Sequence, residues 1–355
     1  MFDKEKLLTS VIPIRTHQPA ATVQHIVYAA DQNYIRHIGT SMLSVLVNNR
    51  FPIHFHLLVS GSENYDFDIF NQLEKINPNY AVTVYHLNTD YFSTLQTTSY
   101  FTIAMYYRMC IPTILNDISD TALYLDTDVL CLGDISELLT VNLDRKLLAA
   151  VPETTLYRAY INKLNVFGFR STDTYFNSGV LLFNNKFWNE SSAYTILSEK
   201  IRQVELSKFI LACLDQDLLN LSCKGKVEWL PESYNWIHWH HQGNELNTNP
   251  NNIRLVHFIG GTKPWHHLGF HPVYDSFYKK SPWYDGYLHQ KPNIDLPFPN
   301  PHQRYKQAAK RLFKQGDKKQ ALTYYKEYLL QKFSLSWIRI SSATLWYQWL
   351  EQIQE

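Results

Sequence analysis

The sequence has 355 residues, of which 45% are hydrophobic and 15% aromatic, and its formal net charge is +1. This composition excludes a chain that is disordered throughout. The near-zero charge excludes a nucleic-acid binder that relies on a basic surface overall. The length favours two units, or one large domain with an appendage.

The four cysteines, Cys110, Cys131, Cys213 and Cys223, form no Cys-x-x-Cys pair, and a secreted disulfide framework would be denser. No segment reaches the ~18–20 apolar residues of a membrane span, and the N-terminus lacks the apolar core of a signal peptide. We therefore expect a cytoplasmic protein. Peripheral attachment to the cytoplasmic face of a membrane is compatible with this expectation.

Residues 1–22 are expected to form an irregular N-terminal arm. After the arm, short apolar runs that predict buried strands alternate with segments of helical spacing. The expected strands are 25–30, 55–59, 81–87 and 122–125, and the expected helices are 35–48, 67–76 and 102–115. This alternation indicates an α/β fold with a parallel sheet.

Further strands are expected at 147–151, 179–183, 227–230 and 255–258, with helices at 193–206 and 215–221. A catalytic domain would then cover residues 23–290, and the proline-rich residues 291–303 predict a linker. We expect residues 304–355 to form a separate basic, aromatic and helical C-terminal region. Residues 301–355 hold ten basic and four acidic side chains, whereas the rest of the chain is slightly acidic.

Helical spacing in the C-terminal region predicts two apolar faces separated by a break at Gly316-Asp317. The first face holds Tyr305, Ala308, Ala309, Leu312 and Phe313, and the second holds Ala321, Leu322, Tyr325, Tyr328 and Leu329. The pattern is that of a single helix pair of tetratricopeptide style. Its basic and aromatic residues suit an anionic membrane surface, but docking on the catalytic domain and a dimer contact remain open.

Asp31 ends the first predicted strand, and Asp126-Thr127-Asp128 follows the apolar strand 122–125. Parallel sheets bind ligands beyond the carboxyl ends of their strands, so we expect these acids at one site. In an extended segment, Asp126 and Asp128 point to the same side, and their hard oxygen atoms suit Mg²⁺ or Mn²⁺. The alternative interpretation is two solvated acids in a turn.

His257 ends another apolar run and precedes the loop Gly260-Gly261-Thr262-Lys263. A lone histidine in such a run is usually a satisfied core residue, and the functional interpretation makes it a third metal ligand. The glycines would let the backbone approach a phosphate group, which Lys263 would neutralise. Because no Walker pattern is present, the loop alone does not specify a phosphate site.

Taken together, the ordered motifs resemble the family 8 glycosyltransferases, a family of bacterial lipopolysaccharide-core enzymes with glycogenin as a more distant relative. The matching blocks are Ala29–Tyr34, Tyr107-Arg108, Leu123–Val129, Tyr175–Leu182 with Asp215-Gln216-Asp217, and His257–His266. The resemblance covers residues 24–285 and extends neither to the arm nor to the C-terminal region. Ser178 departs from the family pattern, in which Ala is common, but it is nearly as small.

The resemblance implies a GT-A fold, a UDP-sugar donor, Mn²⁺ and retention of the anomeric configuration. It implies that Asp126, Asp128 and His257 bind the metal. The other donor contacts that it implies are Ala29, Asp31 and Asn33 at the uridine and ribose, Gly260 and Lys263 at the diphosphate, and Arg108, Asn177, Asp215 and Gln216 around the donor sugar, with Thr127 and Ser178 beside them. The four residues around the sugar are the expected catalytic residues.

Departure of UDP leaves negative charge on the diphosphate, which a metal ion and Lys263 would stabilise without a general acid. Retention is harder to explain, because neutral Gln216 is a poor nucleophile. We expect attack on the same face as departure, with a phosphate oxygen accepting the acceptor's proton. A covalent intermediate on Asp215 or Asp217 is the competing mechanism.

The segment Trp236–His241 places His238 and His240 on one face if it is a strand. We interpret it as an aromatic wall of a sugar groove, with a zinc site as the alternative, since no third ligand is apparent nearby.

The resemblance implies a hexosyltransferase that moves glucose or galactose from a UDP-sugar to a glycan acceptor. The pathway it implies is synthesis of lipopolysaccharide, lipooligosaccharide or another bacterial surface glycan. A glycosylated protein acceptor and a catalytically silent UDP-sugar-binding protein are the alternatives, and no nucleic-acid partner is expected.

Overall fold

A computed structural model describes residues 2–16, 23–98, 102–153, 158–237, 252–261, 263–266, 269, 271–286, 301–314 and 316–338. The chain divides into two compact units. The first unit consists of Met1–Ile259 with Phe277–Asp285, and the second consists of Gly260–Ser276 with Gly286–Glu355. The domain boundaries expected from the sequence stay predictions.

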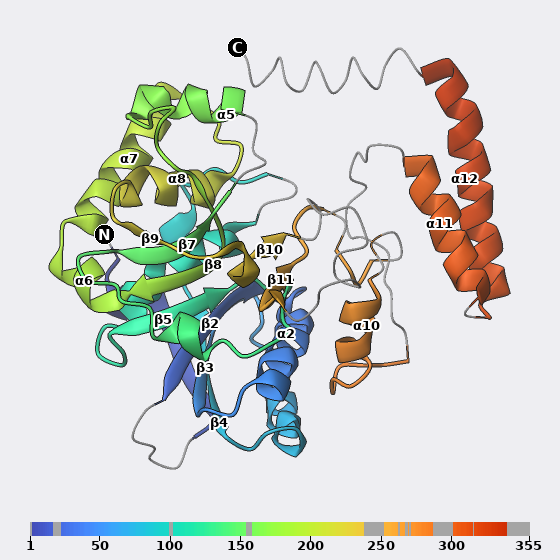
Figure 1. Ribbon diagram of the computed structural model, residues 1–355, viewed down its shortest axis with the longest axis horizontal. Coiled ribbons are helices and arrows are strands. Elements are labelled where there is room, and N and C mark those ends of the chain that lie inside the picture. Colours follow the sequence, from blue (N-terminus) through green and yellow to red (C-terminus); the bar gives the residue numbers. More distant parts are fainter. Residues whose placement is uncertain are drawn as a thin grey trace. The chain divides into compact units, whose positions relative to one another are not determined.

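The first unit is built around an eight-stranded sheet in the order β1-β4-β3-β2-β5-β8-β7-β9 (Figure 1). The strands are β1 (Leu8–Arg15), β2 (Gln24–Asp31), β3 (Ile53–Ser60), β4 (Tyr80–Leu87), β5 (Thr121–Leu125), β7 (Leu148–Pro152), β8 (Phe176–Asn184) and β9 (Val227–Trp229). Strands β4, β3, β2 and β5 run parallel, whereas β8 is antiparallel to both β5 and β7. The α/β prediction is therefore confirmed, but the sheet is mixed rather than parallel throughout.

Both faces of β2 are buried, which explains why its sequence is continuously apolar instead of alternating. Tyr28 faces the long helix α2 (Ile35–Asn48), where its hydroxyl lies 2.9 Å from the Ser41 hydroxyl. Val27 faces the opposite side, in a core that also contains Met109. A slip of one residue would exchange the side chains that pack on α2 with those that pack in the opposite core.

The segment predicted as one helix over 102–115 is instead a 3₁₀ helix, η3 (Ile103–Cys110), followed by one α-helical turn, α3 (Ile111–Ile114). Pro112 lies at the start of α3 and has no backbone N–H. It therefore cannot donate the i to i−4 hydrogen bond that would join α3 to the preceding segment as one α-helix. The segment predicted as a helix over 67–76 is likewise 3₁₀ in form, η1 (Phe67–Lys75).

The expectation of an irregular N-terminal arm is wrong for residues 8–15, which form the edge strand β1. Strand β1 pairs antiparallel with β4, and Arg15 is fastened by an ion pair of 2.9 Å to Glu74 and by stacking 4.8 Å from the Tyr80 ring centroid. Most of β1 is exposed, so the sequence lacks a buried strand's apolar pattern. Its pairing depends on backbone groups that β4 leaves available. Residues 17–22 lie outside the described part of the chain.

A second, three-stranded sheet carries the segment that contains His257. Its strands are β6 (Val129–Cys131), β10 (Trp236–Ile237) and β11 (Leu255–His257). Strand β11 pairs antiparallel with β6 and parallel with β10. Two serines of α2 hold β6 in place, since the Ser41 hydroxyl donates to the Val129 carbonyl at 2.6 Å and the Ser44 hydroxyl accepts from the Cys131 N–H at 2.8 Å.

The remaining helical segments of the described chain are mostly short. They are α1 (Lys4–Leu7), η2 (Thr89–Phe92), α4 (Ser136–Leu139), α5 (Arg158–Lys163), η4 (Leu164–Phe167), α6 (Asn185–Glu190), α7 (Ala193–Ser207), α8 (Leu214–Cys223), η5 (Glu232–Tyr234) and α10 (Pro272–Tyr278). Helices α7 and α8 confirm the helices predicted at 193–206 and 215–221.

In the second unit, α11 (Pro301–Lys314) and α12 (Lys318–Ile338) pack as a hairpin (Figure 1). Gly316 adopts a φ of 91°, which permits the reversal, and the Asp317 side chain accepts from the Gln320 N–H at 3.0 Å. The helix pair and its break are confirmed. Residues 287–300, which include most of the predicted linker, lie outside the described residues.

The interior of this hairpin contains Ala308, Ala309, Leu312, Ala321 and Tyr324. The predicted second face is partly wrong. Leu322 is 69% exposed, and Tyr325 and Leu329 are also exposed, as is Phe313 of the first helix. The buried side chains of α12 are Ala321, Tyr324 and Tyr328, so the face holding Leu322 and Tyr325 is rotated away from the hairpin interior, since one residue on a helix is a rotation of 100°. None of the helices in the described residues has the length and apolar character needed to cross a bilayer.

We predict that Gly39→Ala destabilises the first unit. A Cβ at residue 39 would lie 2.1 Å from Cζ3 of Trp283, whose ring nitrogen donates to the Tyr65 hydroxyl at 2.6 Å and whose ring packs edge-on to Phe70. Overpacking of this kind costs about 1–3 kcal/mol, whereas Gly to Ala in an open helix would stabilise. Thermal unfolding should show a lowered Tm.

The double variant Gly39→Ala with Trp283→Phe is the control, because the smaller ring leaves room for the methyl group. Adding Gly39→Ala to the Trp283→Phe variant should therefore lower the free energy of unfolding by less than adding it to the parent chain. Additive effects of the two substitutions would contradict this contact.

Candidate active site

The candidate site lies where the strand order of the sheet reverses. Strand β2 pairs with β3 on one side and with β5 on the other. Strands β3 and β4 extend the sheet on one side of β2, and the chain then returns to add β5 on the other side. Asp31 ends β2, and Asp126 directly follows β5. The crevice at such a switch point is where open α/β sheets bind their ligands.

Asp126, Asp128 and His257 converge as expected for a metal site. Nε2 of His257 lies 3.2 Å from Oδ1 of Asp128 and 3.7 Å from Oδ2 of Asp126. One ligand atom from each of the three lies within 4.8 Å of the other two. The antiparallel pairing of β11 with β6 brings the histidine there, since His257 pairs with Val129 and the Phe258 N–H donates to the Asp128 carbonyl at 3.0 Å.

The space between these ligands depends on Gly179 of β8. A Cβ at this position would lie 2.1 Å from Cε1 of His257 and 2.8 Å from Oδ2 of Asp126. Only a residue without a side chain lets both ligands occupy their positions. Two carboxylates and an imidazole around a site cleared by a glycine fit a divalent cation such as Mn²⁺ or Mg²⁺.

A chain of amide side chains orients the histidine. Nδ1 of His257 lies 2.9 Å from Oδ1 of Asn235, whose amide nitrogen donates to Oδ1 of Asn177 at 2.9 Å. The same oxygen of Asn177 accepts from the Gly179 N–H at 2.9 Å. An acceptor at Nδ1 assigns the proton to that nitrogen and leaves the lone pair of Nε2 facing the carboxylates, which is the arrangement of a metal-binding histidine.

Arg108 lies buried between two of the acids. Its guanidinium group forms ion pairs of 2.9 Å with Asp126 and 3.0 Å with Asp215, and it donates to the Ser178 carbonyl at 2.6 Å. It also stacks 4.6 Å from the ring centroid of Tyr124. The rigid fork of an arginine side chain suits this task, because one cation must meet acceptors in several directions.

Asp215 and Gln216 lie in the first turn of α8, and both are buried. Burial raises the pKa of Asp215 to about 7 against the opposing charge of Arg108, and Asp126 and Asp217 add to the rise. Oε1 of Gln216 accepts from the Ser178 N–H at 2.9 Å. These contacts place Asp215 and Gln216 beside Arg108 and Ser178, and the predicted contact of these residues with a donor sugar stays a prediction.

Asp217 has a different environment. It is fully buried and accepts hydrogen bonds of 2.5 Å from both Tyr160 and Tyr175 and of 2.8 Å from the Cys213 N–H. Burial raises the pKa of Asp217, and the tyrosine hydrogen bonds oppose that rise. This carboxylate of α8 therefore joins α5, which carries Tyr160, to the residue that precedes β8, Tyr175. This geometry argues against Asp217 as the nucleophile of the competing mechanism.

The residues predicted for the nucleoside lie at the end of β2. Ala29 is nearly buried in the strand, and Asp31 accepts from the Asn33 N–H at 2.9 Å and from the Thr102 hydroxyl at 3.2 Å. Thr127 lies half-buried between the two metal-site acids. These positions fit the prediction that this edge binds the donor.

The loop predicted to hold the diphosphate belongs to the second unit. Gly260 has a φ of 93°, a left-handed conformation that favours glycine, and the Lys263 N–H donates to Nδ1 of His266 at 3.2 Å. The roles of Gly260 and Lys263 stay predictions. Residues 238–241, considered as an aromatic wall or a zinc site, lie outside the described residues.

Comparison with known proteins decides the family. The model of the family described as "Glycosyl transferase family 8" matches residues 25–269, more than two thirds of the chain. The chain belongs to glycosyl transferase family 8.

Curated relatives include a lipopolysaccharide 1,2-glucosyltransferase of Escherichia coli, 30% identical over 74% of this chain and 79% of that protein. A lipopolysaccharide 1,3-galactosyltransferase of Salmonella typhimurium is 28% identical over 87% of this chain and 91% of that protein. Among solved structures, the galactosyltransferase LgtC in complex with donor and acceptor sugar analogues aligns with a TM-score of 0.62 and 25% identity. The alignment covers 73% of this chain and 95% of that one.

These findings confirm the resemblance and the GT-A fold, and they make the protein a UDP-sugar-dependent glycosyltransferase. Two residues of this family 8 site were not predicted from the sequence. Gly179 falls inside a quoted motif but looks like an ordinary glycine in a strand, and Asn235 carries no pattern at all. Their importance depends on contacts between segments far apart in the chain.

We predict that Gly179→Ala weakens divalent-cation binding by roughly 10–100-fold, because the methyl group displaces His257 and Asp126 together. The affinity is measured by titrating the full chain with Mn²⁺ and monitoring free Mn²⁺ by electron paramagnetic resonance. Val180→Ala is the matched control, since Val180 is a buried neighbour on the same strand. That variant should lose stability and keep its cation affinity. Unchanged affinity in Gly179→Ala, with native circular dichroism, would contradict the role of the glycine.

Proposed function

We propose that this enzyme transfers glucose or galactose from a UDP-sugar to a glycan acceptor during synthesis of lipopolysaccharide, lipooligosaccharide or another surface glycan. The observation that carries the proposal is the convergence of Asp126, Asp128 and His257 around the position kept open by Gly179. The sugar classes come from the relatives, one named a glucosyltransferase and another a galactosyltransferase, both of lipopolysaccharide.

In this proposal Asp126, Asp128 and His257 hold Mn²⁺, with Mg²⁺ as a second fit to the same ligands. When bound, the ion supplies positive charge that stabilises the departing diphosphate. Gly260 and Lys263 contribute to the diphosphate site, and Ala29, Asp31, Asn33 and Thr127 contribute to the nucleoside end. The support for the nucleoside end is the carboxyl end of β2 next to β5, where Asp31 is partly exposed.

Arg108, Asn177, Asp215 and Gln216 surround the donor sugar in the proposed complex, with Ser178 between them. Hydrogen bonds of Arg108 to Asp215 and Ser178, and of Ser178 to Gln216, support this set, because they orient these side chains before the substrate binds. Asn177 is held separately, by Gly179 and Asn235. The acid Asp215 would stabilise positive charge that develops on the sugar ring.

Retention then proceeds by attack on the face from which UDP departs. The bond from the anomeric carbon to the phosphate oxygen breaks, the acceptor hydroxyl forms the new bond, and the phosphate oxygen takes the hydroxyl proton. Two contacts favour this route over a covalent intermediate. Gln216 is neutral and its carbonyl oxygen accepts from Ser178, while Asp215 is bound to Arg108.

The first test is UDP release from a panel of UDP-sugars in the presence of Mn²⁺ without acceptor. We expect slow hydrolysis of UDP-glucose or UDP-galactose that stops in EDTA and falls roughly 100-fold or more in Asp128→Ala. A coupled assay for UDP measures the rate. The preferred sugar names the donor.

Glu137→Ala serves as the matched control, because Glu137 is an acid of the following helix α4 outside the cluster. Its rate should match that of the parent chain. UDP binding without release from any sugar, even with lipopolysaccharide-core or glycosylated-protein acceptors, would overturn the transferase proposal in favour of a silent binder.

We also propose that the α11–α12 hairpin makes peripheral contact with an anionic membrane. On α12, Lys318, Leu322, Tyr325, Leu329 and Lys332 recur at helical spacing and are exposed, so they form one stripe with an apolar centre and basic ends. Exposed Lys310 and Lys314 add charge from α11. Apolar side chains flanked by lysines suit the boundary between lipid headgroups and acyl chains.

Replacing Lys310, Lys314 and Lys318 by Gln should weaken binding to anionic vesicles by roughly 100-fold, at about 1 kcal/mol for each charge. Sedimentation of the full chain with phosphatidylglycerol vesicles measures the change. Replacing Lys75, Lys186 and Lys208 of the first unit is the control, since these lysines are also exposed. Equal loss in both triple variants would leave only a general charge effect and contradict a site on the hairpin.

A further inference from the structure

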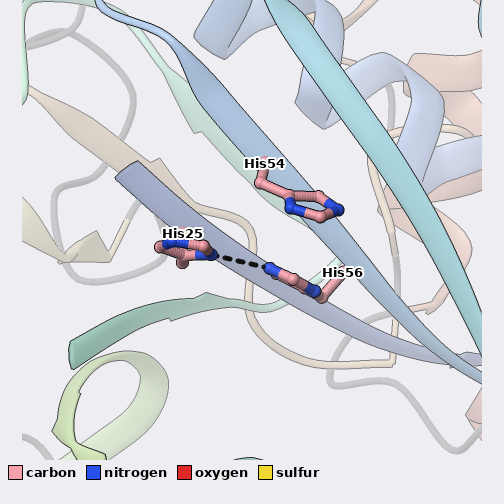
Figure 2. Close-up of side chains that lie close together, drawn as sticks. All are labelled: His25, His54 and His56. Carbon is pink, nitrogen blue, oxygen red and sulfur yellow. Dashed lines mark hydrogen bonds between the residues drawn. The ribbon is translucent and has the colours of Figure 1, made fainter. Parts of the chain in front are cut away.

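Three histidines lie together at the opposite edge of the central sheet from the candidate active site. His25 is near the start of β2, and His54 and His56 are near the start of β3 (Figure 2). His25 and His54 are paired in register, and His56 is two residues further along, so all three project from the same face. Asp31 follows His25 by six residues in an extended strand, which separates the two edges by about 20 Å.

We propose that His25, His54 and His56 form a metal site for a divalent transition-metal ion that prefers imidazole ligands, such as Zn²⁺. One ring nitrogen from each histidine lies within 4.8 Å of the other two. Bonds of about 2.0–2.1 Å in a tetrahedral site bring such nitrogens to roughly 3.3–3.4 Å from one another. To bind an ion, the rings would therefore rotate out of their present stacked arrangement until the three nitrogens converge.

The contacts within the cluster identify the ligand atoms. Nδ1 of His25 lies 2.9 Å from Nε2 of His56 and forms a hydrogen bond with it. In the proposed site, the ion would replace the proton of this hydrogen bond. Nε2 of His54 lies 2.8 Å from the Thr83 hydroxyl, so in the proposed site His54 contributes its other ring nitrogen, Nδ1. Figure 2 shows the three rings gathered around this position.

Strand β4 supplies the hydrogen bonds that would orient two of the ligands. Nδ1 of His56 lies 3.0 Å from the Tyr85 hydroxyl, and Nε2 of His54 has its partner in Thr83 of the same strand. In a metal-bound cluster these outer nitrogens carry the protons, and the two hydroxyl oxygens accept them. A hydrogen bond on the nitrogen opposite the metal is the usual support of a histidine ligand.

The surroundings also favour neutral rings, which metal binding requires. The rings of His54 and His56 stack with centroids 4.1 Å apart, a contact that two imidazolium groups would oppose. Burial lowers the pKa of His56 well below its ordinary value, and His54 and His25 lower it further. His25 and His54 are only partly buried, which gives an ion a route from solvent.

The ligand set distinguishes this site from the candidate active site. Three imidazoles suit Zn²⁺, Cu²⁺ or Ni²⁺, whereas two carboxylates with one imidazole suit Mn²⁺ and Mg²⁺ as well. An ion bound by β2 and β3 would cross-link two parallel strands at their amino ends. It would therefore stabilise the folded chain without taking part in transfer.

The experiment titrates the full-length Asp128→Ala variant with Zn²⁺ against a chromophoric chelator, so that the candidate active site is disabled. We expect one equivalent of Zn²⁺ to remain bound, and the double variant Asp128→Ala with His54→Gln to lose it, with affinity reduced roughly 100-fold or more. Excess Zn²⁺ should raise the Tm of Asp128→Ala by several degrees and leave that of the double variant unchanged. His86→Gln in the Asp128→Ala background is the matched control, since His86 is a buried histidine of β4 outside the cluster.

Co²⁺ provides a spectroscopic check, because a tetrahedral nitrogen site gives visible absorption bands that should vanish with His54→Gln. If His54→Gln lowers the Tm in EDTA, His25→Gln replaces it, since His25 is partly exposed. The proposal is overturned if natively folded Asp128→Ala binds no Zn²⁺, or if removing His54 or His25 leaves its binding unchanged. The three histidines would then be a hydrogen-bonded cluster that only packs the sheet.

Discussion

Charge balance around one buried arginine is the constraint on which the site depends. Arg108 forms ion pairs with Asp126 and Asp215 in a region where burial disfavours any unpaired charge. Without the guanidinium group, two acids from different parts of the chain could not approach each other. Asp128 adds a further carboxylate on the other side of Asp126, and a divalent ion held there would supply the charge that one arginine does not. The cation site and the arginine therefore depend on each other.

The fold brings these charges together through two sheets that share no strand. The large sheet provides the acids at the end of β5 and the open position at Gly179 in β8, while the small sheet provides His257 through the pairing of β11 with β6. The side chains of Asn235 and Asn177 join the two sheets, because Asn235 is hydrogen-bonded at 2.9 Å both to His257 and to Asn177. Asn177, which is predicted to touch the sugar, is thus also part of the support of the proposed metal ligand His257.

The sequence is sufficient to predict those parts of the fold in which local pattern and burial agree. Strand β2 is apolar on both faces, and the acids Asp126 and Asp128 follow the apolar strand β5 in the sequence, so both features could be predicted. Strand β1 could not, because its side chains are exposed and its stability comes from the backbone of β4. The packed face of α12 is predicted only in part, because apolar residues occur on more than one side of that helix. Asn235 could not be predicted, since its role exists only after β10 and β11 lie beside β8.

One oxygen of Asp126 is already committed before any ligand arrives. Oδ1 accepts from the Tyr124 hydroxyl at 2.5 Å and from Arg108 at 2.9 Å, so only Oδ2 faces His257. This acid can therefore offer a cation a single oxygen. An octahedral ion would keep several positions that the described ligands do not fill, and oxygen atoms of a diphosphate are suited to them. If the proposed function holds, protein and nucleotide would share the ion as joint ligands. Each would then bind the ion more tightly in the presence of the other, so that the empty enzyme would exchange its ion readily and the loaded enzyme would retain it.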